Sequence, residues 1–161
     1  MIDKLNSIFK KIEQKKFYFY APILCFLTDI ALIFYISNNI LPRLVNTRMI
    51  KAVLLARGTS INQLSPDSIS FLIQMISTSM RGALGIILII NFIIFMLALK
   101  KFKFGLKYIS GYCLSAAILS IIEITGYIIS GEGFSLITFV TMISYFLIYW
   151  GYRYFSKMKE E

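Results

Sequence analysis

Four long apolar runs follow one another along the chain, and short polar or charged segments separate them. A helix needs about 20 apolar residues to cross the roughly 30 Å hydrocarbon core of a bilayer, and each run is close to that length. The pattern predicts an all-α polytopic membrane protein with four transmembrane helices. The predicted spans are residues 17–41, 83–99, 106–130 and 134–152.

The segment ahead of the first run, residues 1–16, places apolar side chains at helical spacing with lysines between them. This predicts a basic amphipathic helix on the membrane surface, with its apolar stripe at the acyl boundary. The alternative is that the stripe docks onto a helix of a partner. Lysines here and after the second run are expected to meet anionic lipid headgroups. They are Lys10, Lys11, Lys15, Lys16, Lys100, Lys101 and Lys103.

The longest segment between runs, residues 42–82, is expected to form a helical loop outside the membrane. Residues 44–57 have an amphipathic helical pattern that Gly58 ends as a C-cap signal. Ser65 followed by Pro66 predicts a second helix start, and this helix either continues into the second span or hinges before it. Four of the five cations in the loop are predicted to ring the outer mouth of the bundle. They are Arg48, Lys51, Arg57 and Arg81.

The short turn at residues 100–107 carries four cations and no acid, which is typical of a cytoplasmic loop. This orientation places both termini, including the tail 153–161, in the cytoplasm and the 42–82 loop outside. Twelve of the 17 Lys and Arg residues then lie inside. We therefore expect an integral protein of the plasma membrane. No linker rich in Pro, Gly or Ser divides the chain, so residues 1–161 are predicted to form one four-helix membrane domain.

The composition agrees with a membrane protein and narrows the chemistry. The chain is 58% hydrophobic and 16% charged, with a net charge of +9 and a mean hydropathy of +0.74. The cations lie at the ends of apolar runs, so lipid rather than nucleic acid accounts for them. There is no histidine, which excludes His-based catalysis, and Cys25 and Cys113 lie in apolar runs as small buried side chains. We expect no enzyme activity, cofactor or metal.

Every predicted span carries a polar group that lipid would penalise, and apart from Lys107 at the start of the third span none carries Lys or Arg. Such groups are expected to face one another inside the bundle. Asp29 lies in the first span and Asn91 in the second, while the third and fourth each carry a polar stripe at helical spacing. The predicted intramembrane cluster is Asp29, Asn91, Ser120, Glu123, Tyr127, Thr141 and Tyr145.

Two interpretations of this cluster remain open. Asp29 and Glu123 could relay a cation or proton in a small oligomeric channel or transporter, because an ionisable group inside a membrane is costly to keep. Alternatively, the polar groups hold the helices together by hydrogen bonds. We favour the second, since a polar cluster alone is only moderately specific. It makes the protein a non-catalytic subunit or accessory component of a membrane complex, as a homo-oligomer or with a membrane-protein partner.

Overall fold

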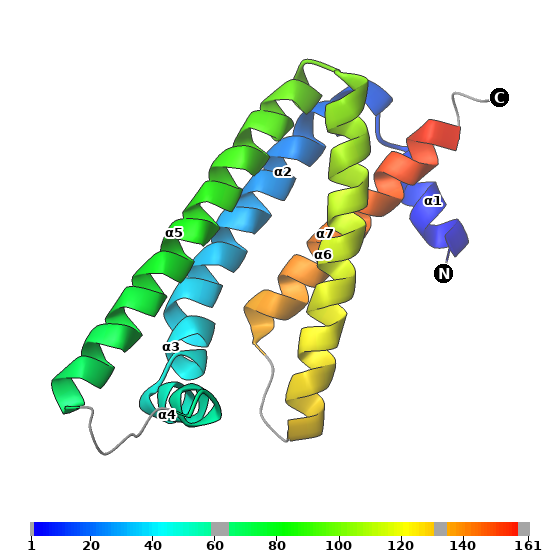
Figure 1. The fold of residues 1–161 in the computed structure, drawn as a ribbon. Coiled ribbons are helices and arrows are strands. Elements are labelled where there is room, and N and C mark those ends of the chain that lie inside the picture. The colour runs from blue at the N-terminus through cyan, green and yellow to red at the C-terminus, as the bar shows by residue number, and fades with distance from the viewer. Residues whose placement is uncertain (1, 59–64, 131–134, 158–161) are drawn as a thin grey trace. The chain divides into compact units, whose positions relative to one another are not determined.

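The structure is a computed structural model, and it describes residues 2–58, 65–130 and 135–157. The described residues form helices joined by short turns and include no strand. Figure 1 shows the helices in chain order. They are α1 (Ile2–Lys10), α2 (Gln14–Tyr35), the π-helical turn η1 (Ile36–Ile40), α3 (Leu41–Leu44), α4 (Thr47–Ala56), α5 (Pro66–Leu99), α6 (Lys103–Ser130) and α7 (Leu136–Lys157).

Three stretches of helix in the described chain are long and apolar enough to cross a membrane. They are Gln14–Leu44, Pro66–Leu99 and Lys103–Ile129. The expected all-helical fold is confirmed for the described residues, and three such helices are compatible with the expected multi-pass membrane protein. The remaining long helix, α7, has 22 residues, but its threonines, tyrosines and basic end lower its mean hydropathy. A fourth span therefore stays a prediction.

The chain divides into two compact units, which are described separately. Unit 1 consists of Met1–Leu32 with Ile90–Glu161, and unit 2 consists of Ile33–Ile89. The long helices α2 and α5 each contribute residues to both units. Unit 1 therefore contains α1, most of α2, the last part of α5, and all of α6 and α7.

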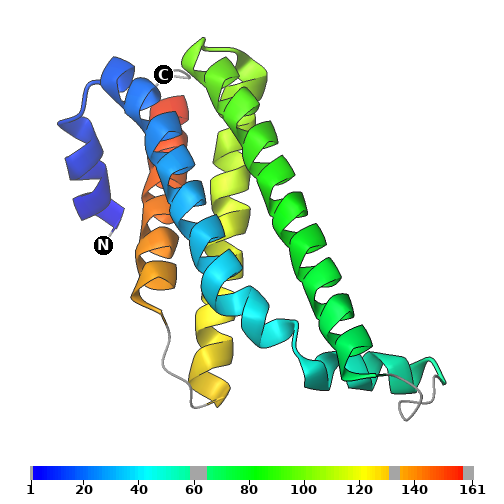
Figure 2. The same cartoon turned by 90° about the vertical axis from the view of Figure 1, so that its left-hand side faces the viewer.

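Packing in unit 1 is built around α6 and α7, which lie against each other. In Figure 2, α6 descends from the turn that ends α5, and α7 returns beside it. Buried apolar side chains from every helix of the unit fill the space between them. These include Phe9, Phe17, Cys25, Phe95, Ile109, Cys113, Ala117, Ile148 and Phe155.

The basic N-terminal helix α1 packs against α7 of the same chain. Phe9 is buried, and its ring meets that of Phe17 edge to face at a centroid distance of 5.8 Å. The indole Nε1 of Trp150 donates a hydrogen bond of 3.1 Å to Asn6 Oδ1. Part of the stripe expected on the membrane surface is thus covered by the protein itself, while Ile8 stays exposed.

The basic turn between α5 and α6 is only three residues long because Lys101 adopts a left-handed conformation, with φ at 62°. Its N–H donates to Ala98 O at 2.8 Å, and the N–H of Phe102 donates to Leu97 O at 3.1 Å. These two bonds form a Schellman motif. The tight turn brings the start of α6 against the end of α5. Only a glycine fits at position 105, because a Cβ there would lie 2.7 Å from the backbone nitrogen of Ala98.

In unit 2 the first long helix runs further than the expected end at residue 41. The π-helical turn carries the chain into α3, with Leu41 N–H bonded to Ile36 O. Pro42 lacks an N–H and its ring would crowd the carbonyl of the preceding turn of an α-helix. The wider turn accommodates it, so the helix continues to Leu44.

The segment predicted to form an outer loop contains α4 and the start of α5, whose bounds differ from the expected ones. Asn46 caps α4 by accepting a hydrogen bond of 2.9 Å from Met49 N–H, so this helix begins at Thr47 rather than at residue 44. Gly58 has a φ of 73°, as expected of a C-cap glycine. Ser65 accepts from the N–H of Ser68 at the start of α5, which confirms the predicted N-cap.

Helix α5 continues without a break from Pro66 through Arg81 and Gly82 to Leu99, so of the two alternatives the continuous helix is observed. Residues 59–64, and residues 131–133 between the third and fourth predicted spans, lie outside the described residues.

Candidate functional site

A buried carboxylate occupies the middle of unit 1. Asp29 lies on α2 and only 1% of its surface is exposed. It is surrounded by polar side chains from the other three long helices: Asn91 from α5, Tyr112 from α6 and Tyr145 from α7. Segments that are 62 to 116 residues apart in the chain therefore meet at one side chain.

Both oxygens of Asp29 accept hydrogen bonds. Asn91 Nδ2 donates to Oδ2 at 2.9 Å, while the hydroxyls of Tyr112 and Tyr145 donate to Oδ1 at 2.9 Å and 2.6 Å. Tyr108 adds a second layer, because its hydroxyl donates to Asn91 Oδ1 at 2.9 Å and so fixes the orientation of that amide. We call these five residues the Asp29 centre.

Aromatic packing holds the donors of the Asp29 centre in place. The rings of Tyr108 and Tyr112 are stacked, with centroids 5.8 Å apart and planes at 11°. Tyr112 meets Tyr145 edge to face at 6.0 Å, and Phe95 packs on Tyr112 at 6.2 Å. Aromatic pairs in these arrangements gain about 0.5–1.5 kcal/mol beyond area burial. The hydroxyls are consequently held toward the carboxylate.

Helical periodicity explains how α6 supplies two tyrosines. Tyr108 and Tyr112 are four residues apart and share one face of the helix. One turn before Asp29 on α2, Cys25 meets Cys113 of α6 with a sulfur-to-sulfur distance of 3.5 Å, and both side chains are fully buried. Small side chains at this level let the two helices approach closely enough for Tyr112 to reach Asp29.

The geometry suits a carboxyl group that stays buried rather than one that water or ions can reach. Three donors replace the water that Asp29 loses, and leaving a buried polar group without partners would cost about 1–3 kcal/mol. Among the described residues, no group of three His, Cys, Asp or Glu side chains is placed to hold a metal ion. Chemically, this arrangement can bind four helices together at one point.

Only part of the cluster expected from the sequence lies at this centre. Asp29, Asn91 and Tyr145 are joined by hydrogen bonds, and Tyr112 joins them from the predicted polar stripe of the third span. Tyr108 is an addition that sequence reasoning missed, and the signal that could have found it is its position one turn before Tyr112 on the same face of α6.

The other expected members lie elsewhere. The hydroxyls of Ser120 and Thr141 donate to backbone oxygens of their own helices, those of Ala116 and Thr138. Tyr127 is half-buried. Thr138 Oγ1 donates to Glu123 Oε1 at 3.4 Å, which joins α6 to α7 at a second, looser polar contact.

The residues expected to form one cluster therefore lie in two groups. Helical spacing shows which residues share a face of the helix, but residues on one face can still lie far apart along the helix axis. Glu123 follows Tyr112 by eleven residues on α6, which corresponds to a rise of about 16 Å along the axis. The two carboxyl groups consequently do not share a site.

The cations predicted to face lipid headgroups or the outer mouth are exposed. Arg81 Nη2 donates to Ser37 O at 3.5 Å within unit 2. Whether the outer cations form a ring stays a prediction. The exposed cations are Lys10, Lys11, Lys15, Lys16, Lys100, Lys101, Lys103, Arg48, Lys51, Arg57 and Arg81.

Comparison with protein-family models, with curated proteins and with solved structures finds no match to this chain.

The geometry predicts that Tyr145→Phe destabilises the protein. The substitution removes the shortest bond to Asp29 and leaves a buried carboxylate with two donors instead of three. We expect a loss of about 2 kcal/mol, seen as a melting temperature about 4–8 °C lower in detergent. Tyr20→Phe is the matched control, because Tyr20 is 62% exposed and the same atom is removed.

A double-mutant cycle of Tyr145→Phe with Asp29→Asn isolates this bond from other effects of the substitutions. Additive losses in the cycle would show that the two side chains do not stabilise each other. Equal melting of the Tyr145→Phe and Tyr20→Phe variants would contradict the prediction.

Proposed function

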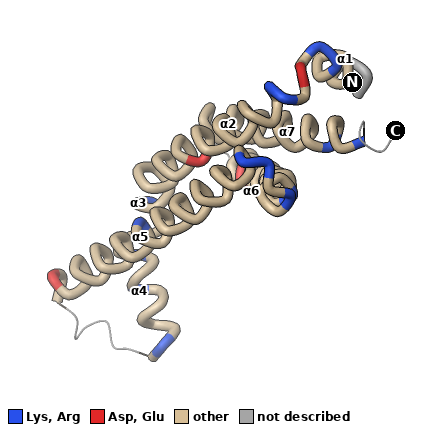
Figure 3. Tube along the Cα trace, turned by 90° about the horizontal axis from the view of Figure 1, so that it is seen from above, with Lys and Arg blue, Asp and Glu red and all other residues tan. Residues whose placement is uncertain are grey.

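We propose that α7 crosses the membrane as the fourth span and that both ends of the chain lie in the cytoplasm, at the plasma membrane. The support is the charge of unit 1. Lys and Arg gather at helix ends, and the middle stretches of α2, α6 and α7 contain none (Figure 3). Side chains from the start of α2, the start of α6 and the end of α7 line one common pocket. These three ends therefore lie on one side, as the positive-inside bias requires.

We further propose that the protein is a non-catalytic subunit or accessory component of a membrane complex. The observation that carries this proposal is the closed Asp29 centre. Its carboxylate is almost fully buried and already accepts three hydrogen bonds from neighbouring helices. A group saturated in this way stabilises a bundle and has little capacity left to coordinate a passing ion.

A face of α6 supports an association with another membrane helix. Gly111 and Ser115 are exposed and lie one turn apart on one side of the helix. A Cβ on Gly111 would meet nothing within 4 Å. Small residues on a lipid-exposed face allow a second helix to approach closely, which is how helices associate in lipid. The partner is a second copy of this chain or another membrane protein.

The alternative function is a small oligomeric channel or transporter that uses Asp29 and Glu123. One observation favours it: a carboxylate bonded to two tyrosine hydroxyls at the level of a membrane span has the composition of a proton relay. It requires that the Asp29 centre open to water during a transport cycle.

The proposed topology predicts distinct labelling of two introduced thiols in intact cells. A membrane-impermeant thiol reagent added outside should modify Asp67→Cys, at the start of α5, and should leave Ser156→Cys, near the end of α7, unmodified. The native cysteines add no background because both are fully buried. Modification of Ser156→Cys in intact cells would overturn the orientation.

The accessory function predicts that the purified protein, reconstituted in liposomes, conducts no protons or monovalent cations above protein-free liposomes. Asp29→Asn should then lower the melting temperature without changing this background, whereas Glu123→Gln should affect stability less because its one described bond is long. A flux that Asp29→Asn abolishes in well-inserted protein would establish the transport alternative instead.

The proposed partner face predicts that Ser115→Phe disrupts association. In mild detergent the wild type should run with a partner or as an oligomer, and the added ring should separate the helices while the melting temperature of the chain itself changes little. Ile121→Phe is the control, since Ile121 is 52% exposed but lies away from the small residues on the helical wheel. Equal association of wild type and Ser115→Phe would remove this face from the proposal.

A further inference from the structure

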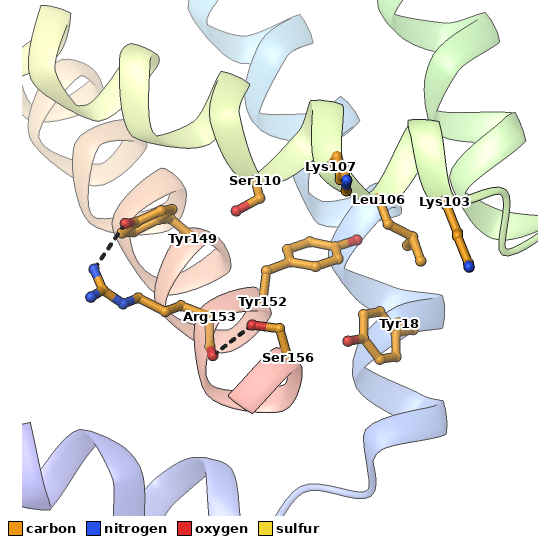
Figure 4. A pocket seen from close by; sticks show the side chains of 9 residues that line it. All are labelled: Tyr18, Lys103, Leu106, Lys107, Ser110, Tyr149, Tyr152, Arg153 and Ser156. Atoms are coloured by element: carbon orange, nitrogen blue, oxygen red, sulfur yellow. Dashed lines mark hydrogen bonds between the residues drawn. The ribbon is translucent and has the colours of Figure 1, made fainter. Parts of the chain in front are cut away.

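A second polar site lies at the basic end of unit 1, apart from the Asp29 centre. It is a cavity of about 750 Å³ between the start of α2, the start of α6 and the end of α7. Figure 4 shows its lining. We call it the basic pocket, and its polar lining includes Lys103, Lys107, Arg153, Tyr18, Tyr149 and Tyr152.

The charges of the basic pocket have one sign. Lys103 and Lys107 come from α6 and Arg153 from α7, and no acidic residue lines the cavity. Within the described part of the chain the one ion pair, Lys16 with Glu13, involves none of these cations. Arg153 Nη1 donates to the hydroxyl of Tyr149 at 3.3 Å, which orients the guanidinium along the wall of the cavity. Such a site attracts an anion.

Tyr152 supplies an independent observation. Its side chain is only 5% exposed, and its hydroxyl is buried without a hydrogen-bond partner in the described residues. Figure 4 shows the aromatic ring of Tyr152 among the side chains that line the pocket, with its hydroxyl end pointing toward Leu106 and Lys107. A buried hydroxyl without a partner costs about 1–3 kcal/mol, so a shift of the Tyr152 side chain that brings this hydroxyl to a ligand oxygen would recover that cost.

We propose that the basic pocket binds a phosphate group, carried by the headgroup of an anionic amphiphile. Three cations more than neutralise the charge of about −2 on a phosphate monoester, and the guanidinium of Arg153 suits its oxygens. A bare ion would leave most of the cavity unfilled, since cavities of this size hold whole small molecules. The aromatic walls and Leu106 accommodate the less polar remainder of the headgroup.

This inference goes beyond the proposed accessory function and does not depend on it. The pocket adjoins the basic turn between α5 and α6, where the positive-inside bias already places anionic lipid. The inference adds a defined site with a phosphate-recognising lining, whereas the lysines expected from the sequence to meet headgroups provide only diffuse attraction.

The test measures binding of phosphatidic acid, dispersed in a non-ionic detergent, to the purified full-length protein. The double variant Lys107→Gln/Arg153→Gln should bind at least about tenfold more weakly than wild type, because two charge-assisted contacts are lost. The matched control is Lys100→Gln/Lys101→Gln, which removes the same charge from the adjoining turn but not from the cavity lining. This control should bind within about twofold of wild type.

Tyr152→Phe provides a second measurement that separates binding from folding. Without lipid its melting temperature should equal or exceed that of wild type, because the hydroxyl that is lost has no partner. With phosphatidic acid its affinity should fall several-fold. A structural role for the hydroxyl would give the opposite pattern, with lower stability and unchanged affinity.

Soluble glycerol phosphate distinguishes the two sources of the phosphate. If it competes with phosphatidic acid, the phosphate ester alone is sufficient; if only the lipid binds, the membrane supplies the ligand, and both results support the proposal. Equal losses in the two double variants would indicate a general charge effect and overturn it. Equal binding of phosphatidylcholine, or wild-type affinity in Tyr152→Phe, would also overturn it.

Discussion

Burying the carboxyl group of Asp29 is the constraint on which unit 1 depends. Removing such a group from water costs several kcal/mol unless hydrogen-bond donors take the place of the water. Asp29 obtains its donors from Asn91, Tyr112 and Tyr145, which belong to three different helices. A shift of one helix along its axis would leave at least one donor or the carboxylate unpaired. The Asp29 centre therefore fixes the register of α5, α6 and α7 against α2.

This role for polar groups follows from the solvent. Lipid tails are as apolar as leucine side chains, so apolar surface gives helices in a bilayer little preference for one another. In unit 1 the specific contacts are instead the Asp29 centre, the Thr138–Glu123 contact and the aromatic cluster that includes Phe9 and Phe17. The first two join the long helices to one another, and the third attaches α1 to them.

The sequence predicted where helices begin and end better than it predicted which polar side chains lie at the same level along their helix axes. Caps are local, so the signals at Gly58 and Ser65 located helix ends correctly. The scarcity of polar residues in the runs identified Asp29 and Asn91 as inward-facing. Glu123 was misplaced because position along a helix axis depends on how the helices pair, which one chain's periodicity does not encode.

The π-helical turn changes the angular phase of the helix that carries it. An extra residue in one turn rotates everything that follows by about 100° relative to a regular α-helix. The hydrophobic period read before residue 36 therefore cannot be extended to Leu41 and Val45, which are both buried in unit 2. Deleting one residue from Ser37–Asn39 would restore the regular period, turn these two side chains away from their core and press the ring of Pro42 against a carbonyl.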